Sequence, residues 1–247
     1  EKGVLHFGSR MGYPAGAFNR RKYQVFGIRE GLTHPGTWYL DRPAGKVVYW
    51  PKPGEDMAKV RVVAPRMETI LSVCGSSKAP VKNVRLEGLV LTATATPCMS
   101  ASFGGSGTPG AVYVVWGDGC AFERLVIRHV GATGFYMRQS KRCRFAASSV
   151  TDCGSSAMCV YADATEIVSN RLLRVGLAFP SACSATIGGE GTRFANNEVA
   201  HSPYSGLILR GDVEAALSGL RAAETMEPAA DPGSPAAPAT PATPAAS

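Results

Sequence analysis

Three carboxylates follow apolar segments of the sequence at one shared offset. Asp163, Glu190 and Asp212 stand three residues after the last apolar residue of an alternating segment, namely Val160, Ile187 and Leu209. If these segments are strands stacked on one another, the carboxylates form a column with neighbours about 5 Å apart at the backbone. Retaining glycosidases use two carboxyl groups at about that separation. We therefore take the three as catalytic candidates, with Glu190 as the middle member.

Two other interpretations of this column stay open. The carboxylates could bind Ca²⁺, which accepts several carboxylate oxygens. Alternatively they are turn acids that point into water, with Asp212 capping a helix. No other cofactor or metal is predicted, because the sequence has no Gly-rich phosphate loop, no nucleophile elbow and no zinc-type pairing of cysteine and histidine.

A second set of residues alternates with the apolar positions of the same segments. It consists of Tyr136, Arg138, Tyr161 and Arg210. Aromatic faces stack on sugar rings, and guanidinium forks bind carboxylates or hydroxyls. We predict that this outward face is a substrate groove for a polysaccharide or oligosaccharide, with a solvated sheet as the alternative.

A third set shares another position of the pattern. His129, Asp152 and His201 each stand seven residues after an aligned apolar residue. Such a column could act as acid and base, or its members could be turn residues satisfied by backbone groups. We count His201 among the substrate-binding candidates.

These expectations depend on a repeat between Val81 and Asp212. The blocks align on Phe122, Phe145, Ile167 and Phe194, at spacings of 23, 22 and 27 residues, with Leu86 another 36 residues upstream. Three positions on, the blocks carry Leu89, Leu125, Ser148, Asn170 and Asn197; five positions on, they carry Leu91, Ile127, Val150, Leu172 and Val199. This frame is typical of one coil of a β-solenoid.

A second strand is predicted before each block. Its inward pairs are Val112/Val114, Phe135/Met137, Met158/Val160, Ala185/Ile187 and Leu207/Leu209. Stacking would place Asn170 over Asn197, where their amides can bond between coils, although both could be ordinary turn residues. A doubly wound α/β fold is excluded, because no stretch from 81 to 212 is long and amphipathic enough for crossover helices.

Composition fits one elongated all-β domain. The 247 residues carry 26 Lys and Arg against 19 Asp and Glu, a net charge of +7. The basic residues are dispersed, which favours a solvated basic face over an anionic-polymer surface, and no nucleic-acid motif is present. No apolar run approaches the length of a membrane span. We expect a monomer with neither nucleic-acid nor membrane partners.

The cysteines show one regular feature. Cys120 and Cys143 each stand two residues before an aligned phenylalanine. Stacked in neighbouring coils, they would be within disulfide reach. Buried reduced thiols are the favoured interpretation.

The two ends of the chain depart from the repeat. Residues 1–80 are predicted to form a small β subdomain that caps the solenoid, with a hairpin at 37–50 and short strands at 60–63 and 69–73. Residues 213–227 could form a helix, and the Pro/Ala/Thr-rich residues 228–247 should be disordered. The start at Glu1 without a signal segment predicts a mature form or a fragment, and the abrupt end of the repeat favours a truncated or frame-shifted chain.

Three segments resemble a known group of proteins. They are PGTWYLDRPAGKVVYWPKPGED, LAFPSACSATIGGEG and RFANNEVAHSPYSGLIL. From about Tyr23 to Asp212 the chain resembles bacterial right-handed parallel β-helix (pectate-lyase-like) proteins related to glycoside hydrolase families 120 and 141. The resemblance implies secreted or periplasmic cleavage of plant or algal polysaccharide by two carboxylates. The Asp-x-Gly-Gly-Ile-Tyr-like stretch of that group has no counterpart after Asp212.

Three functions follow from these features. The first is glycoside hydrolysis, which a truncated chain could have lost. The second is polysaccharide lyase activity on uronate polymers, which the positive charge favours. The third is noncatalytic glycan binding or a structural role.

Overall fold

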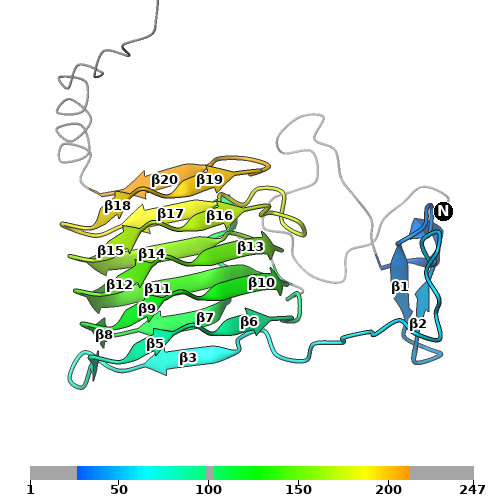
Figure 1. Ribbon diagram of the computed structural model, residues 1–247, viewed down its shortest axis with the longest axis horizontal. Helices are drawn as coiled ribbons and strands as arrows, with labels where there is room; N and C mark the ends of the chain where they lie inside the picture. Colours follow the sequence, from blue (N-terminus) through cyan, green and yellow to red (C-terminus); the bar gives the residue numbers. More distant parts are fainter. Residues whose placement is uncertain (1–26, 98, 100–102, 212–247) are drawn as a thin grey trace, which may run out of the picture. The chain divides into compact units, whose positions relative to one another are not determined.

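The computed structural model describes residues 27–97, 99 and 103–211. Asp212, the expected helix at 213–227 and the expected tail at 228–247 lie outside the described residues. The described chain from Leu71 onward folds as a right-handed parallel β-helix, which confirms the predicted all-β solenoid (Figure 1). Its coils stack in the order of the sequence.

Three parallel sheets form the walls of the solenoid. The eight-stranded sheet contains β3 (Leu71–Cys74), β4 (Val81–Lys82), β7 (Gly110–Val115), β8 (Gly117–Asp118), β11 (Thr133–Lys141), β14 (Met158–Asp163), β17 (Ala185–Gly188) and β20 (Leu207–Arg210). The first five-stranded sheet contains β5 (Arg85–Glu87), β9 (Ala121–Glu123), β12 (Arg144–Ala146), β15 (Glu166–Val168) and β18 (Arg193–Ala195). The second five-stranded sheet contains β6 (Val90–Thr92), β10 (Val126–Val130), β13 (Ser149–Cys153), β16 (Arg171–Leu173) and β19 (Glu198–Ala200).

The register of these strands confirms the predicted repeat. Phe145 pairs with Phe122 on one side and with Ile167 on the other, and Ile167 pairs with Phe194. Phe122, Phe145 and Ile167 are fully buried. The remaining inward rows also match the expected ones, namely Leu91, Ile127, Val150, Leu172 and Val199, and Val112, Phe135, Met158 and Ala185. Together these rows form the hydrophobic core.

Each corner of a coil is made by a single residue in the left-handed region. The three corner residues of a coil stand three positions before, two positions after and seven positions after its aligned apolar residue. Their φ angles lie between +46° and +70°. Their members are Asn83, Gly119, Arg142, Ala164 and Gly191; Gly88, Arg124, Ala147, Ser169 and Asn196; and Ala93, His129, Asp152, Arg174 and His201. This conformation costs a non-glycine residue roughly 1 to 2 kcal/mol. Its recurrence at fixed positions shows that the turns of the coil demand it.

A ladder of polar side chains links successive coils from the inside. Asn170 is buried, and its Nδ2 donates to Oδ1 of Asn197 over 2.9 Å, as the stacking predicts. Its own Oδ1 accepts the backbone N–H of Ser148 at 2.9 Å. The amides thus satisfy buried backbone groups of one coil with side chains of the next.

The predicted thiol row is also present. Cys120 and Cys143 are buried free thiols and form no disulfide. Burial raises the pKa of the Cys143 thiol to about 11. Both sulfurs lie within hydrogen-bonding distance of carbonyls of their own coil, those of Asp118 and Lys141. These cysteines fill the interior instead of providing reactive groups.

The N-terminal segment contains the predicted hairpin. After a short 3-10 helix (Arg29–Gly31), β1 (Trp38–Asp41) pairs antiparallel with β2 (Lys46–Tyr49). The prediction of a strand at 60–63 was wrong, since those residues form no strand. The strand expected at 69–73 is β3, which pairs with β7 and so belongs to the solenoid. That the segment caps the solenoid stays a prediction.

The last inward pair differs from its predecessors. In β20, Leu207 and Leu209 are 40% and 55% exposed, whereas Ala185 and Ile187 in β17 are buried. The Ala185 N–H donates to the Gly206 carbonyl, just as the Met158 N–H donates to the Ser184 carbonyl one coil earlier. Leu207 therefore continues the row of Ala185. It is exposed because no described coil covers it.

Candidate functional site

The outer face of the first five-stranded sheet is occupied by ion pairs. Glu123 forms ion pairs with Arg85 at 2.6 Å and with Arg144 at 2.9 Å, and Arg144 also forms an ion pair with Glu166. Because these charges neutralise one another across coils, the face offers few free groups to a ligand.

The outer face of the eight-stranded sheet is aromatic. Tyr113 stacks on Tyr136 with ring centroids 5.5 Å apart, and Tyr136 lies 6.2 Å from Tyr161. The guanidinium carbon of Arg138 lies 5.8 Å from the centroid of Tyr113, within the range of a cation–π contact. Burial raises the pKa of the Tyr136 phenol further above physiological pH, where the phenol is a neutral hydrogen-bond donor. Three of the four predicted groove residues are thus brought together.

Two hollows lie along this face. The first hollow has a volume of about 510 Å³ and is lined by Tyr113, Tyr136 and Arg138 together with Glu68 and Thr108. It contains the stacked tyrosines and the predicted guanidinium.

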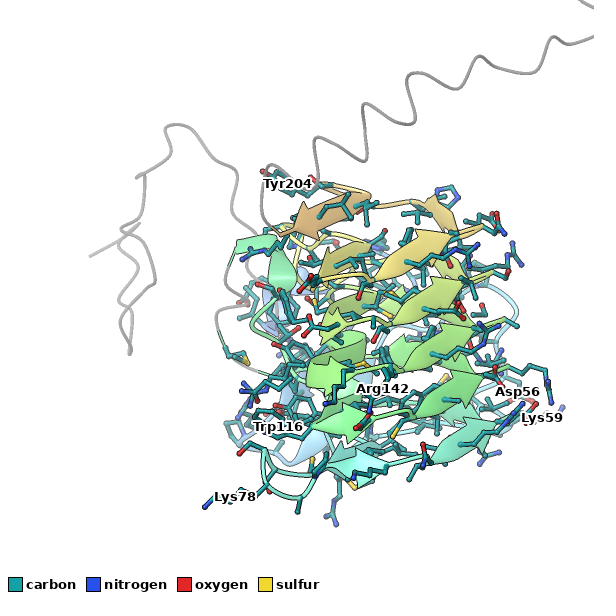
Figure 2. The ribbon with its side chains drawn as sticks, turned by 90° about the vertical axis from the view of Figure 1, so that its left-hand side faces the viewer. Asp56, Lys59, Lys78, Trp116, Arg142 and Tyr204 are labelled. Atoms are coloured by element: carbon teal, nitrogen blue, oxygen red, sulfur yellow. The ribbon has the colours of Figure 1, made fainter. Side chains whose placement is uncertain are left out.

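The second hollow has a volume of about 250 Å³ and begins one residue further along β11. Its lining includes Trp116, Gln139, Lys141, Tyr161 and Asp163. Figure 2 shows Trp116 above the loop that carries Lys78, and Ser77 and Pro80 of that loop also line this hollow. Two consecutive residues of β11 therefore line the two hollows, Arg138 the first and Gln139 the second.

Two of the predicted catalytic carboxylates occupy neighbouring coils. The backbone N–H of Glu190 donates to Oδ1 of Asp163 at 2.9 Å, and the Ala164 N–H donates to the Glu190 carbonyl at 2.7 Å. Both acids are exposed. Asp163 lines the second hollow, whereas Glu190 does not.

The third member of the column, Asp212, lies outside the described residues. Among the residues that the structure describes, no group of three or more His, Cys, Asp or Glu could hold a metal ion. Since that search excludes Asp212, calcium binding by the column stays a prediction.

Two predicted substrate-binding residues lie outside the hollows. Arg210 is the exposed last residue of β20, and His201 is an exposed corner residue after β19. Neither lines the first or the second hollow.

The column of His129, Asp152 and His201 also contains Arg174. Arg174 occupies the corner between Asp152 and His201, and it donates to both oxygens of Asp152 at 2.6 and 2.8 Å. The Arg174 guanidinium holds the pKa of Asp152 below its usual value. An ionised, paired carboxylate is a poor general base, so this arrangement favours the turn interpretation over acid–base chemistry.

Sequence reasoning missed several residues of the two hollows. Tyr113 alternates with Val112 and Val114, the same signal that identified Tyr136. Trp116, Gln139 and Lys141 carry no such signal, because they follow the regular part of their strands. Only the folded backbone brings them beside Tyr161.

Comparisons with known proteins add no relative: no family model, curated protein or solved structure matches the chain. The described residues contain no helix long and apolar enough to cross a membrane.

Proposed function

We propose that the protein binds a glycan on the outer face of its eight-stranded sheet. The observation that carries this proposal is the contiguous set of Tyr113, Tyr136, Tyr161 and Arg138 beside two hollows. Sugar rings present apolar faces that pack on aromatic rings, while their hydroxyls bond to polar groups at the rim. The parallel β-helix architecture and the resemblance to carbohydrate-active β-helix proteins agree with this function.

Binding to a polysaccharide panel tests this proposal. The panel contains neutral polymers (xylan, galactan and β-glucan) and acidic polymers (polygalacturonate and alginate), and affinity electrophoresis measures retardation of the full chain. Tyr136→Ala should weaken binding about tenfold, because packing of a sugar ring on one aromatic ring is worth on the order of 1 kcal/mol or more. Tyr204→Ala, a change of an exposed tyrosine in neither hollow, is the matched control and should have no effect. Failure of every polymer to retard the chain would refute the proposal.

Glycoside hydrolysis is a second candidate function. It is supported by the position of Asp163 in the second hollow beside Tyr161, with Glu190 on the next coil. In this mechanism one carboxyl group protonates the leaving oxygen and the other attacks or activates water. The sequence resemblance to glycoside hydrolase families 120 and 141 also implies secretion.

Product analysis separates hydrolysis from the other candidates. New reducing ends without ultraviolet absorbance indicate a hydrolase, and an unsaturated uronate chromophore indicates a lyase. Under the hydrolase proposal, Glu190→Gln and Asp163→Asn should each lower kcat by orders of magnitude, because an amide cannot transfer the proton. Binding without either product leaves a noncatalytic glycan-binding protein.

A further inference from the structure

Two left-handed residues do not belong to the corners of the solenoid. Among the described non-glycine residues from β3 to β20, only Trp116 (φ +56°) and Gln139 (φ +51°) have positive φ outside the three corner positions. Both stand six residues before an aligned phenylalanine, so they share one column. Both also line the second hollow.

The fold does not require this conformation at that column. The neighbouring strand β14 does without a residue at this position: Tyr161 pairs with Arg138 and Ala162 with Ser140, and no residue from Met158 to Asp163 has positive φ. From Met158 to Arg174 the coil closes with left-handed residues at its three corners alone, which are Ala164, Ser169 and Arg174. The strain at Trp116 and Gln139 is therefore additional to what the turns demand. Left-handed non-glycine residues and β-bulges away from turns are found preferentially at binding sites, where they redirect side chains.

The surrounding coil holds the bulge in place. The register of β11 against β14 shifts between Arg138 and Ser140, which leaves Gln139 as the extra residue. The buried hydroxyl of Ser140 accepts the Gly117 N–H and donates to the Arg138 carbonyl, both at 2.9 Å. The Trp116 carbonyl accepts the Val81 N–H at 2.9 Å. The backbone around the hollow is thus fixed before any ligand arrives.

The charges around the second hollow cancel. Asp118 is buried and engaged by Arg142, whose Nη2 lies 2.7 Å from Oδ2. Lys141 lies in register with Asp163 on the neighbouring strand. By count, the carboxylates Asp118 and Asp163 are balanced by Arg142 and Lys141, so the hollow has no excess charge to recognise a charged ligand.

The size and lining of the hollow indicate the ligand. At about 250 Å³ it is smaller than the roughly 300–1,000 Å³ of sites for drug-sized ligands, which suits one ring. The Trp116 and Tyr161 rings offer apolar faces, while Gln139, Lys141 and Asp163 supply donors and acceptors for hydroxyl groups. A ring with one apolar face and several hydroxyls matches this lining.

We propose that the second hollow is a preformed subsite for one neutral sugar residue, built by the bulge that turns Trp116 and Gln139 toward it. The inference rests on the proposed glycan binding and specifies the class of sugar. Because Arg138 lines the first hollow and the next residue of β11, Gln139, lines the second, the glycan extends from this subsite along β11 toward Arg138 and Tyr136. Its direction therefore follows one coil and not the stack of coils.

The substitution Gln139→Gly tests the subsite without endangering the fold. Glycine adopts positive φ without the penalty that glutamine incurs, so Tm should not fall. The variant lacks the amide, and its affinity for the neutral polymers xylan, galactan or β-glucan should fall about fivefold to tenfold, as for one lost hydrogen bond. Ala147→Gly, at an exposed corner residue with φ +50°, makes the same backbone change away from the hollow and should leave affinity unchanged.

Trp116→Gly is the second variant and should weaken neutral-polymer binding at least tenfold. If Tyr136→Ala weakens binding while Gln139→Gly and Trp116→Gly do not, the subsite is refuted and the glycan-binding face stands. If the chain binds polygalacturonate or alginate but no neutral polymer, the neutral class is refuted. If it binds no polymer of the panel, the proposed function fails and the subsite fails with it.

Discussion

Asn170 is the residue on which the spacing of two coils most clearly depends. Its amide nitrogen donates to Asn197 Oδ1 and to the Phe145 carbonyl, while its oxygen accepts from Ser148. The position was predictable, because small or amide residues recur three places after the aligned apolar residue. A buried amide in a solenoid has few partners besides the neighbouring coils.

Replacing Asn170 by alanine should therefore be costly. The change leaves the buried Ser148 N–H without its partner and removes the side-chain bonds to Asn197 and to the Phe145 carbonyl, and we expect a loss of about 2 to 4 kcal/mol in the free energy of unfolding. Urea denaturation measures it, with Ser149→Ala on the outer face as a control that should change stability by less than about 0.5 kcal/mol. Equal stability of the two variants would show that the ladder contributes nothing.

The ion pair between Asp152 and Arg174 makes the stability of the fold depend on pH. Since Arg174 lowers the pKa of Asp152 in the folded state, this carboxylate stabilises the fold above its unfolded pKa, near 3.9. That contribution disappears as pH falls through the lower folded pKa. Asp152→Asn should therefore be slightly less stable than the parent at pH 7, and this difference should shrink as the pH falls below about 3.9 and in high salt. A difference that grows on acidification would contradict the ion pair.

At the scale of elements, the aligned strands were predictable and the bulge was not. Phe122, Phe145 and Ile167 were found because burial imposes a period on the sequence. The same counting places Ser140 three residues after Met137, in the column of Asp163. The inserted Gln139 shifts the register, so that Lys141 lies opposite Asp163 instead. The apolar pattern of β11 ends at Met137, before the bulge at Gln139, so the pattern could not predict the bulge.

The interior row of the first five-stranded sheet gives a direct stability prediction. Phe145 is fully buried between Phe122 and Ile167, and its ring lies 4.4 Å from that of Phe135. Phe145→Ala should cost about 3 to 5 kcal/mol through the cavity it leaves. Thermal or chemical denaturation checks this value, and a loss below about 1 kcal/mol would be incompatible with the burial.

At the scale of the whole molecule, the sheets of the solenoid differ in the side chains on their outer faces. The first five-stranded sheet is covered by ion pairs between coils, whereas the eight-stranded sheet presents tyrosines, a tryptophan and two hollows. The sequence predicted the fold and half of the aromatic face, since both follow from strand periodicity. It could not predict the second hollow, because loop residues and bulges from separate coils meet there only after folding.

A crystal structure of the full chain with a polymer-derived oligosaccharide would show directly whether the eight-stranded sheet binds glycan. We expect sugar rings on the outer face of this sheet, one stacked on Tyr136 in the first hollow and one beside Trp116 and Gln139 in the second. Sugar bound instead on either five-stranded sheet, or on the β1–β2 hairpin with both hollows empty, would contradict it.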